Sequence, residues 1–430
     1  MDIKGKYESK VQKIGLSCDA FSTGCVILCL LFLAPYVSSN GGTLVMWFLP
    51  LACIVPFAVM PLVYMGIHKY DTLLFGRYHF VMPISAFIAS PFFVMAWSAN
   101  GEGASQSCLV FFGFLVFAMA IMVYRYCAFS VRARLGGVSI VDKYPVYELV
   151  CAVGCAAAAV AFALFLRYDP DTVYVNTAYV MGGVTVLLAL AQYLITFYGI
   201  PRLGGRRVES VKSVFNSIFG GLDVKMYLSA LFFEAAFAVV VALLVYFGIA
   251  LDIGLSGIIA VAATVIAVYG VSAFFCARYI TRRSIKLSIM NIVCVILPCG
   301  ILTLLASLNK RGDGVLAGLI IAAIILSVGG AVAVRQTKLR LLTVKPRVTS
   351  GSVFILFDLT MCAAAALALV SAAIVANVFT YTLSVTAFIY GFAVAVVLAC
   401  VAMILCSPPK RIVATPGESK DMPTVDDSQI

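Results

Sequence analysis

Three acidic residues lie inside long apolar stretches of this sequence, where ionisable side chains are costly to bury. They are Asp19, Glu234 and Asp358. A carboxyl group in apolar surroundings can bind and release a proton, and it can also pair with a cation or a basic side chain. We therefore treat these three residues as candidates for binding a substrate or a coupling proton.

Ion pairing at the ends of helices is the structural alternative for these acids. Asp358 could pair with Arg347, and Asp19 with Lys13. Such pairs would hold a gate closed rather than bind a solute. Arg125 presents the same choice, because it could bind a carboxylated substrate or simply anchor its helix at the membrane surface.

Twelve apolar runs contain or border these residues. The chain is 63% hydrophobic and only 11% charged, whereas about a quarter of a soluble domain is charged. Each run is about 20 residues or longer, enough to cross the bilayer as a helix. The predicted spans are 14–37, 44–67, 79–98, 107–129, 147–167, 174–199, 227–250, 255–277, 287–308, 314–334, 353–376 and 381–406.

The basic residues occupy alternate gaps between these spans. Counted from the N-terminal arm, the odd gaps, together with Arg125 at the adjoining end of span 107–129, hold 27 of the 30 Lys and Arg residues. Cytoplasmic segments are rich in Lys and Arg, so the alternation predicts twelve crossings with both termini in the cytoplasm. It also accounts for the net charge of +11 without a nucleic acid, since nucleic-acid binding needs clustered basic residues.

The spans divide six plus six around the longest internal gap. In that gap, Val208, Val211, Phe215 and Phe219 recur at helical spacing between charged residues, which favours a helix lying at the membrane interface. The predicted organisation is a cytoplasmic arm (1–13), an N-terminal six-helix bundle (14–199), a cytoplasmic linker (200–226), a C-terminal six-helix bundle (227–406) and a disordered tail (407–430). We expect a monomer in the plasma membrane.

Several short motifs are similar to those of one transporter family. One segment runs from the end of span two towards span three and contains Met60-Pro61-Leu62-Val63-Tyr64-Met65-Gly66 and Phe75-Gly76-Arg77-Tyr78. Two others are Glu209–Phe215, before span seven, and Lys345–Phe354, which leads into span eleven. Together they resemble the glycoside–pentoside–hexuronide:cation symporters, the melibiose-permease-like branch of the major facilitator superfamily. The resemblance implies two six-helix bundles of the major facilitator fold, and a gating role for Gly76, Arg77 and Arg347 in the cytoplasmic loops.

The sequence departs from that family at its functional acids. The acidic pair that helps bind the coupling cation in span two is replaced by Pro56 and Met60. The sugar-binding acid of span one falls near Ala20, one position from Asp19, and the acid expected in span four falls near Tyr124. The resemblance therefore implies the fold but not sodium-coupled sugar transport.

The leading functional hypothesis is a secondary active transporter for a small polar solute, sugar-like or an organic anion, with a proton or cation as coupling ion. A lipid-linked saccharide flippase and a transporter-derived sensor or scaffold are the alternatives. The sequence has neither HExxH nor GxxxxGK[ST], so we expect no enzyme activity, no catalytic residue, no cofactor and no metal site. The expected partners are the solute, its coupling ion and the bilayer.

Overall fold

The computed structural model describes mainly the second half of the chain and one helical pair of the first half. The described residues are 77–98, 104–136, 222–251, 253–281, 284–308, 313–344, 350–382 and 384–406, with scattered positions between 51 and 63 and between 149 and 220. The predicted N-terminal arm, most of the linker and the predicted tail lie outside them.

Six long helices form an antiparallel bundle in the second half of the chain. Short connections join consecutive helices, so each helix runs opposite to its predecessor, and a short 3-10 helix precedes α11. The elements are α8 (Val224–Ala250), α9 (Gly254–Tyr279), α10 (Ile285–Leu308), η1 (Asp313–Val315), α11 (Leu316–Val344), α12 (Ser350–Thr382) and α13 (Ala387–Leu405).

The bundle has two chemically different ends. Lys225 at the start of α8, Arg278 at the end of α9 and Lys286 at the start of α10 all lie at the end where α11 and α13 finish. We call this the basic end. It corresponds to the side that the charge pattern predicts to be cytoplasmic.

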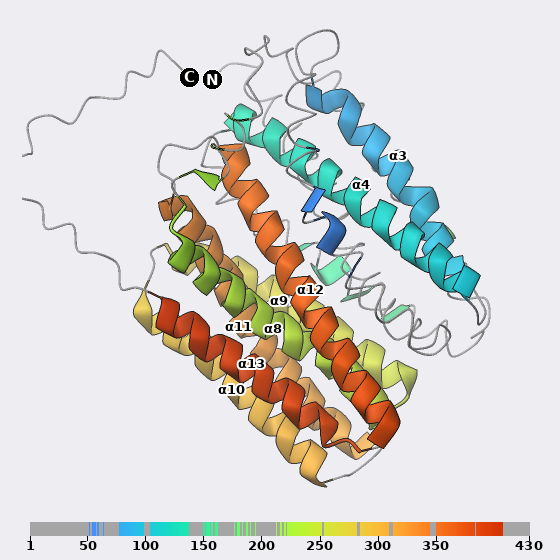
Figure 1. Ribbon diagram of the computed structural model, residues 1–430, viewed down its shortest axis with the longest axis vertical. Helices are drawn as coiled ribbons and strands as arrows, with labels where there is room; N and C mark the ends of the chain where they lie inside the picture. Colours follow the sequence, from blue (N-terminus) through green and yellow to red (C-terminus); the bar gives the residue numbers. More distant parts are fainter. Residues whose placement is uncertain are drawn as a thin grey trace, which may run out of the picture.

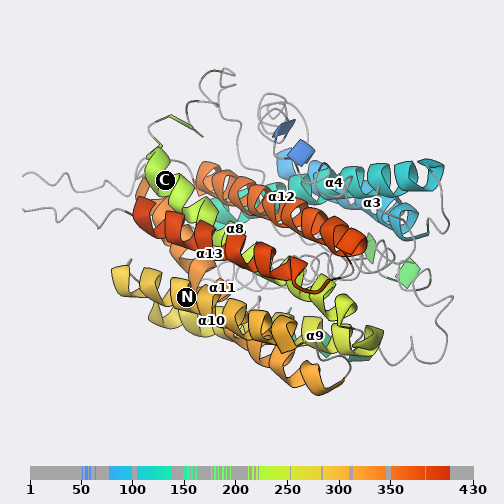
Figure 2. The ribbon, with the colours of Figure 1, turned by 60° about the horizontal axis from the view of Figure 1, so that its bottom comes forward.

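The six helices pack as two layers of three (Figure 1, Figure 2). In one layer α8 lies between α12 and α13, and in the other α11 lies between α9 and α10. The central helices α8 and α11 also contact each other across the layers, as do α10 and α13. Four helices, α8, α13, α10 and α11, therefore enclose a common interior.

The first half of the chain contributes the pair α3 (Arg77–Ser98) and α4 (Ala104–Gly136), of which α4 contacts α12 (Figure 1). Their close approach depends on Gly113. A Cβ atom at this position would lie 2.9 Å from the backbone nitrogen of Ala96 and 2.9 Å from the carbonyl oxygen of Phe92. Small residues allow this kind of backbone contact between membrane helices.

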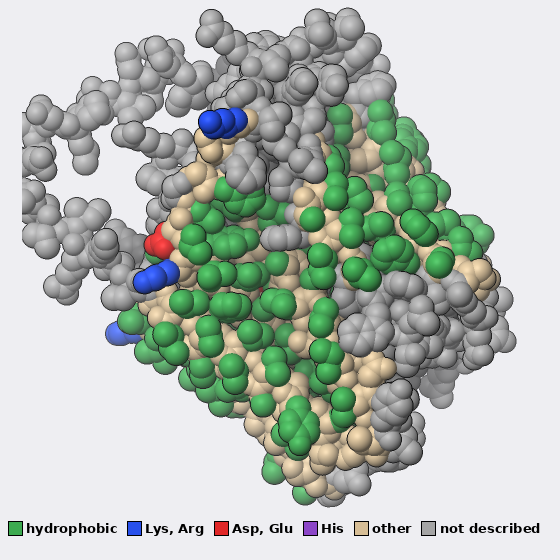
Figure 3. Space-filling model, viewed as in Figure 1, with side chains coloured by type: hydrophobic (Ala, Val, Ile, Leu, Met, Phe, Trp, Pro, Cys, Tyr) green, Lys and Arg blue, Asp and Glu red, His purple; other side chains and the backbone are tan. Residues whose placement is uncertain are grey.

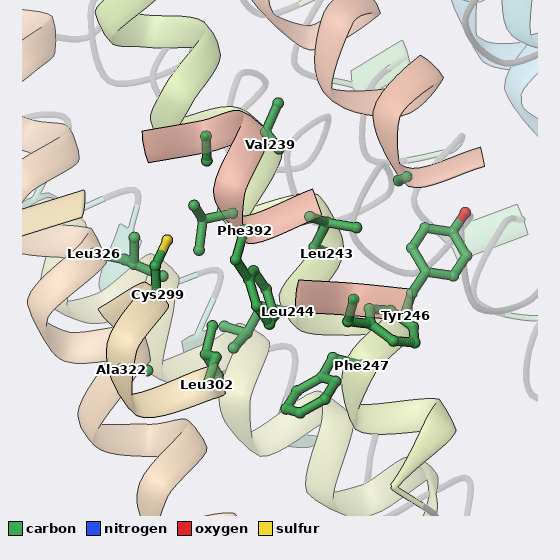
Figure 4. Packing of buried hydrophobic residues seen from close by; sticks show 14 of the residues in the cluster. Val239, Leu243, Leu244, Tyr246, Phe247, Cys299, Leu302, Ala322, Leu326 and Phe392 are labelled. Atoms are coloured by element: carbon green, nitrogen blue, oxygen red, sulfur yellow. The ribbon is translucent and has the colours of Figure 1, made fainter. Parts of the chain in front are cut away.

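The core of the bundle alternates aromatic and small side chains. Phe247 of α8 packs against Phe388 and Phe392 of α13, with ring centroids 5.3 and 5.6 Å apart. Figure 4 shows Phe247 and Phe392 among the buried hydrophobic side chains of this core. Alanine residues of α11 and α13, among them Ala322 and Ala395, are fully buried beside them. Because lipid is as apolar as these side chains, such helices associate through close packing.

The outer surface is apolar, as a membrane-spanning bundle requires. Figure 3 shows hydrophobic side chains over the whole described face, with the coloured charged side chains along its upper left edge. Within the described residues, six helices are long and apolar enough to cross a membrane, and α3 and α4 contain shorter apolar stretches (Phe87–Ala96 and Cys108–Tyr124). These elements confirm an all-helical, multi-pass membrane protein.

Several helix boundaries differ from the sequence prediction, among them the ends of α4 and α12, which lie seven and six residues beyond the predicted spans. The predicted span 314–334 corresponds to α11, which continues ten residues further to Val344. The predicted span 381–406 corresponds to α13, which begins six residues later at Ala387. Residues 335–344 are polar enough to end a hydropathy window, yet Arg, Gln and Lys are good helix formers, and the neighbouring helices provide hydrogen bonds for the polar side chains.

Candidate functional site

Four consecutive residues of α11 reach four different helices near the basic end. Successive residues of an α-helix project about 100° apart, so a run of four covers every side. Arg335 contacts α9, Gln336 contacts α10, Thr337 contacts α8 and Lys338 contacts α12. Near the basic end, α11 is therefore the central helix of the bundle.

Glu234 of α8 is held by one of these residues. The Thr337 hydroxyl donates a hydrogen bond of 2.8 Å to the Glu234 Oε1 atom. The Glu234 side chain is 4% exposed and that of Thr337 is 1% exposed, so the contact is enclosed by protein. A hydroxyl donor satisfies a carboxylate oxygen without neutralising its charge.

Two further polar contacts tie α10 to its neighbours. The Ser288 hydroxyl donates to Gln336 Oε1 at 3.3 Å, which links α10 to α11. The same hydroxyl oxygen lies 3.6 Å from the Cys406 Sγ atom at the end of α13.

A fourth contact connects the remaining pair of helices, α8 and α13. The Ser229 hydroxyl of α8 donates a hydrogen bond of 2.7 Å to the carbonyl oxygen of Ala402 in α13. The four helices α8, α13, α10 and α11 are thus joined in sequence by polar contacts. We call this set the polar ring, and it consists of Ser229, Glu234, Ser288, Gln336, Thr337 and Cys406.

Asn291 lies next to the polar ring on α10. It belongs to the buried face of that helix together with Ser288, one turn earlier, and Val295, one turn later. Its side chain is 0% exposed, and neither its Oδ1 nor its Nδ2 atom has a hydrogen-bond partner among the described residues. A buried carboxamide of this kind is unusual, because buried polar groups normally have partners.

The two basic residues of the α11 run make contacts with α9 and α12. Arg335 donates from Nε to the carbonyl oxygen of Ile280 at 3.1 Å and from Nη2 to that of Ala277 at 3.4 Å. It thereby caps the end of α9, where carbonyl groups have no partner in their own helix. The Lys338 ammonium lies 5.2 Å from the Phe357 ring centroid, which links α11 to α12 through a cation–π contact.

The structure places some of the predicted site residues. Glu234 is buried within the C-terminal bundle, Asp358 lies in the third turn of α12, Arg125 lies on α4, and Arg77 begins α3. Asp19, Gly76 and Arg347 lie outside the described residues.

The sequence alone did not predict the polar residues that lie near Glu234 in the bundle. Gln336 and Thr337 fell in a predicted gap, and Ser288 and Asn291 are small polar residues at the edge of a predicted span. Ser288 and Asn291 do share a helical face, but without their partners on α11 and α13 this pattern is too common to mark a site. Only the packing of four helices brings the set together.

Comparisons with known proteins identify the fold. No protein-family model and no curated protein matches the sequence. Among solved structures, nucleoside transporter NupG is similar with a TM-score of 0.64 at 16% identity, covering 93% of this chain and 98% of that one. Its D323A mutant gives 0.63 at 15% identity, covering 93% and 100%. A bacterial homologue of the human drug peptide transporters PepT1 and PepT2 gives 0.62 at 13% identity, covering 93% and 98%.

These similarities show that the chain shares its fold with solved transporters. The melibiose-permease-like branch stays a prediction from the sequence.

Proposed function

We propose that this protein is a secondary active transporter that moves a small polar solute by alternating access. The observation that carries the proposal is its fold, which matches that of solved transporters over 93% of the chain. In such proteins two bundles rock around a central binding site, and the movement needs no nucleotide. The apolar surface and buried carboxyl group of the C-terminal bundle agree with this role.

The proposed arrangement is twelve spans in two six-helix bundles, with both termini in the cytoplasm. We propose the same five parts as the sequence predicts. They are the arm (1–13), the N-terminal bundle (14–199), the linker (200–226), the C-terminal bundle (227–406) and the tail (407–430). We further propose that the protein works as a monomer in the plasma membrane. Basic residues are found at only two of the gaps predicted to be external. This distribution is the main support for placing both termini in the cytoplasm.

Glu234 is the proposed proton-coupling residue. It is a buried carboxyl group on α8 that accepts a hydrogen bond from the Thr337 hydroxyl. A carboxyl group buried in a membrane helix can bind and release a proton during alternating access. Asp19, Asp358 and Arg125 are proposed to contact the solute or a proton, and Gly76, Arg77 and Arg347 to act in gating.

The substrate class remains sugar-like or an organic anion in this proposal, and the solved neighbours add two solutes to test. These neighbours are a nucleoside transporter and a homologue of peptide transporters. A flippase for a lipid-linked saccharide would need a row of basic residues along the central cavity, and the predicted spans contain none deep inside. A sensor or scaffold derived from a transporter would keep the fold without uptake.

Uptake into proteoliposomes under an imposed pH or sodium gradient tests the proposal. The solutes are a hexose, a nucleoside, a dipeptide and a dicarboxylate, each offered separately. We expect a gradient to drive accumulation of at least one. Absence of uptake for all four under both gradients would contradict transport of these classes and would favour the sensor or scaffold.

Glu234→Gln tests the coupling role, and Asp223→Asn is its matched control. Both variants replace one carboxylate at or near α8, but Asp223 is exposed and only accepts a hydrogen bond from the Met226 backbone amide. We expect Glu234→Gln to lose accumulation against a gradient while it retains solute exchange, and Asp223→Asn to resemble the wild type. Accumulation of wild-type size in Glu234→Gln would remove Glu234 from coupling.

A further inference from the structure

Asn291 needs a partner that the described protein groups do not supply. Both ends of its carboxamide lie in a 0% exposed position on the face of α10 that packs against α11 and α13. Burying a donor and an acceptor without partners costs free energy that a leucine of similar size would not cost. Lipid cannot provide these hydrogen bonds, so the partner must lie inside the bundle.

The two ends of the Asn291 carboxamide indicate the hydrogen-bonding chemistry that its partner must have. The Nδ2 atom offers hydrogens and the Oδ1 atom offers lone pairs, so the partner must both accept and donate. A water molecule does both at once, whereas a cation would bind Oδ1 and leave the Nδ2 hydrogens unpaired. A transported solute is too large for a residue with no exposed surface.

The surroundings of Asn291 suit a bound water. Ser288 lies one turn away on the same buried face, and its hydroxyl contacts both Gln336 and Cys406. A buried water typically makes about three hydrogen bonds, and it needs polar groups from more than one element. The polar ring supplies such groups from four helices.

Water can also reach this place. Asn291 is six residues from the start of α10, which corresponds to about 9 Å at the rise of an α-helix. Cys406, which contacts Ser288, is partly exposed at the end of α13. The site is therefore close to the aqueous phase at the basic end, although Asn291 itself is enclosed.

We propose that Asn291 and the polar ring hold an internal water molecule between α10, α11 and α13. The water accepts from Asn291 Nδ2, donates to Asn291 Oδ1 and makes its remaining bond within the ring. It thus joins α10 to the helices beside it. This site does not depend on what the protein transports.

The thermal stability of Asn291→Leu tests the proposal in purified protein. If the water is present, leucine removes its main partners and the melting temperature falls by several degrees. If Asn291 is simply dry and unpaired, leucine removes a buried polar group and the melting temperature rises or stays the same, which would overturn the proposal.

Asn377→Leu is the matched control for this measurement. The Asn377 amide donates to the carbonyl oxygen of Ala373 in its own helix, so its replacement tests a general effect of Asn-to-Leu changes in the bundle. We expect a clearly smaller decrease than in Asn291→Leu. An equal decrease in both variants would also count against the water site.

Cryo-electron microscopy of the wild-type protein decides the matter if Asn291→Leu does not fold. At a resolution where ordered waters are visible, we expect one density within hydrogen-bond distance of both ends of the Asn291 carboxamide. A direct contact of Asn291 with another side chain, or no density, would overturn the proposal. A density at the shorter distances typical of metal–oxygen bonds would do so too, because it would identify a cation.

Discussion

At the scale of residues, the bundle places its polar side chains where each can bond to a neighbouring helix. Glu234 is the clearest case, because a carboxylate in a membrane is costly unless other groups satisfy its oxygens. Thr337 supplies one donor at 2.8 Å. The same hydroxyl therefore holds the two central helices together and positions the carboxyl group that we propose for coupling.

Replacing Thr337 should destabilise the protein through Glu234. We expect Thr337→Val to lower the free energy of unfolding by about 0.6 to 1.7 kcal/mol, the range measured for hydrogen bonds between membrane helices. In the double variant Thr337→Val/Glu234→Gln the two losses should not fully add, because Glu234→Gln replaces a charged acceptor by a neutral one and so already weakens the contact. Unfolding in detergent, followed by denaturant titration, measures all three variants.

Thr264→Val is the control for this cycle. The Thr264 hydroxyl donates to Ala260 in its own helix, so its loss breaks no contact between helices. We expect this variant to stay close to the wild type and to add to Glu234→Gln. Full additivity of Thr337→Val with Glu234→Gln would show that the 2.8 Å contact contributes nothing to stability.

The sequence singled out one residue of the polar ring. Glu234 stands out because a charged residue in an apolar run is rare, and this signal needs no structure. Thr337, Ser288 and Asn291 give no such signal, because hydroxyl and amide side chains are common near helix ends. Their importance arises from contacts between residues some 50 to 100 positions apart, which hydropathy and spacing do not encode.

At the scale of elements, α11 shows what hydropathy can and cannot predict. The apolar run 314–334 predicted a span, and a helix is present. The run Arg335–Lys338 looked like a cytoplasmic gap, because Lys and Arg mark the inner ends of spans. These residues instead continue the helix, and two of them, Gln336 and Thr337, are buried among its neighbours.

Close packing of α11 depends on one glycine of a Gly-Gly pair. A Cβ atom at Gly329 would overlap Cys294 of α10 and lie 2.6 Å from Cε1 of Phe237 on α8. A Cβ atom at Gly330 would meet nothing within 4 Å. The two neighbouring positions therefore provide a test of packing with its own control.

Gly329→Ala should destabilise the protein, and Gly330→Ala should not. We expect a loss of about 1–3 kcal/mol for Gly329→Ala, the usual cost of an extra group in a packed core. Alanine favours a helix over glycine by about 0.8–1.0 kcal/mol, so Gly330→Ala should be neutral or slightly stabilising. Melting temperatures of both variants in one detergent give the answer, and equal effects would contradict the tight contact with Cys294 and Phe237.

At the scale of the whole molecule, the described helices and the fold similarity support one architecture. The two three-helix layers of the C-terminal bundle meet α4 through α12, so the halves of the chain contact each other directly (Figure 1). The motifs around span two and before span eleven predicted a transporter fold, and solved transporters share the fold of this chain. The melibiose-permease-like branch stays a prediction, since the acidic residues expected at its cation site are replaced here by Pro56 and Met60.

The charges predict the orientation of the molecule in the membrane, and this prediction can be tested at the two ends of the C-terminal bundle. Ser284 lies between α9 and α10 at the basic end, and Gly314 is an exposed residue of η1 at the opposite end. The charge pattern places Ser284 in the cytoplasm and Gly314 outside. A side chain at Gly314 meets nothing within 4 Å, so cysteine fits there without strain from packing.

Single cysteines at these positions should therefore react from opposite sides of the membrane. In a background whose 14 native cysteines are replaced, we expect Gly314→Cys to react with an impermeant maleimide on intact cells. Ser284→Cys should react only after the membrane is permeabilised, because its side of the bundle carries the basic residues that resist translocation. Labelling of Ser284→Cys on intact cells, with protection of Gly314→Cys, would reverse the orientation and place the polar ring at the external end.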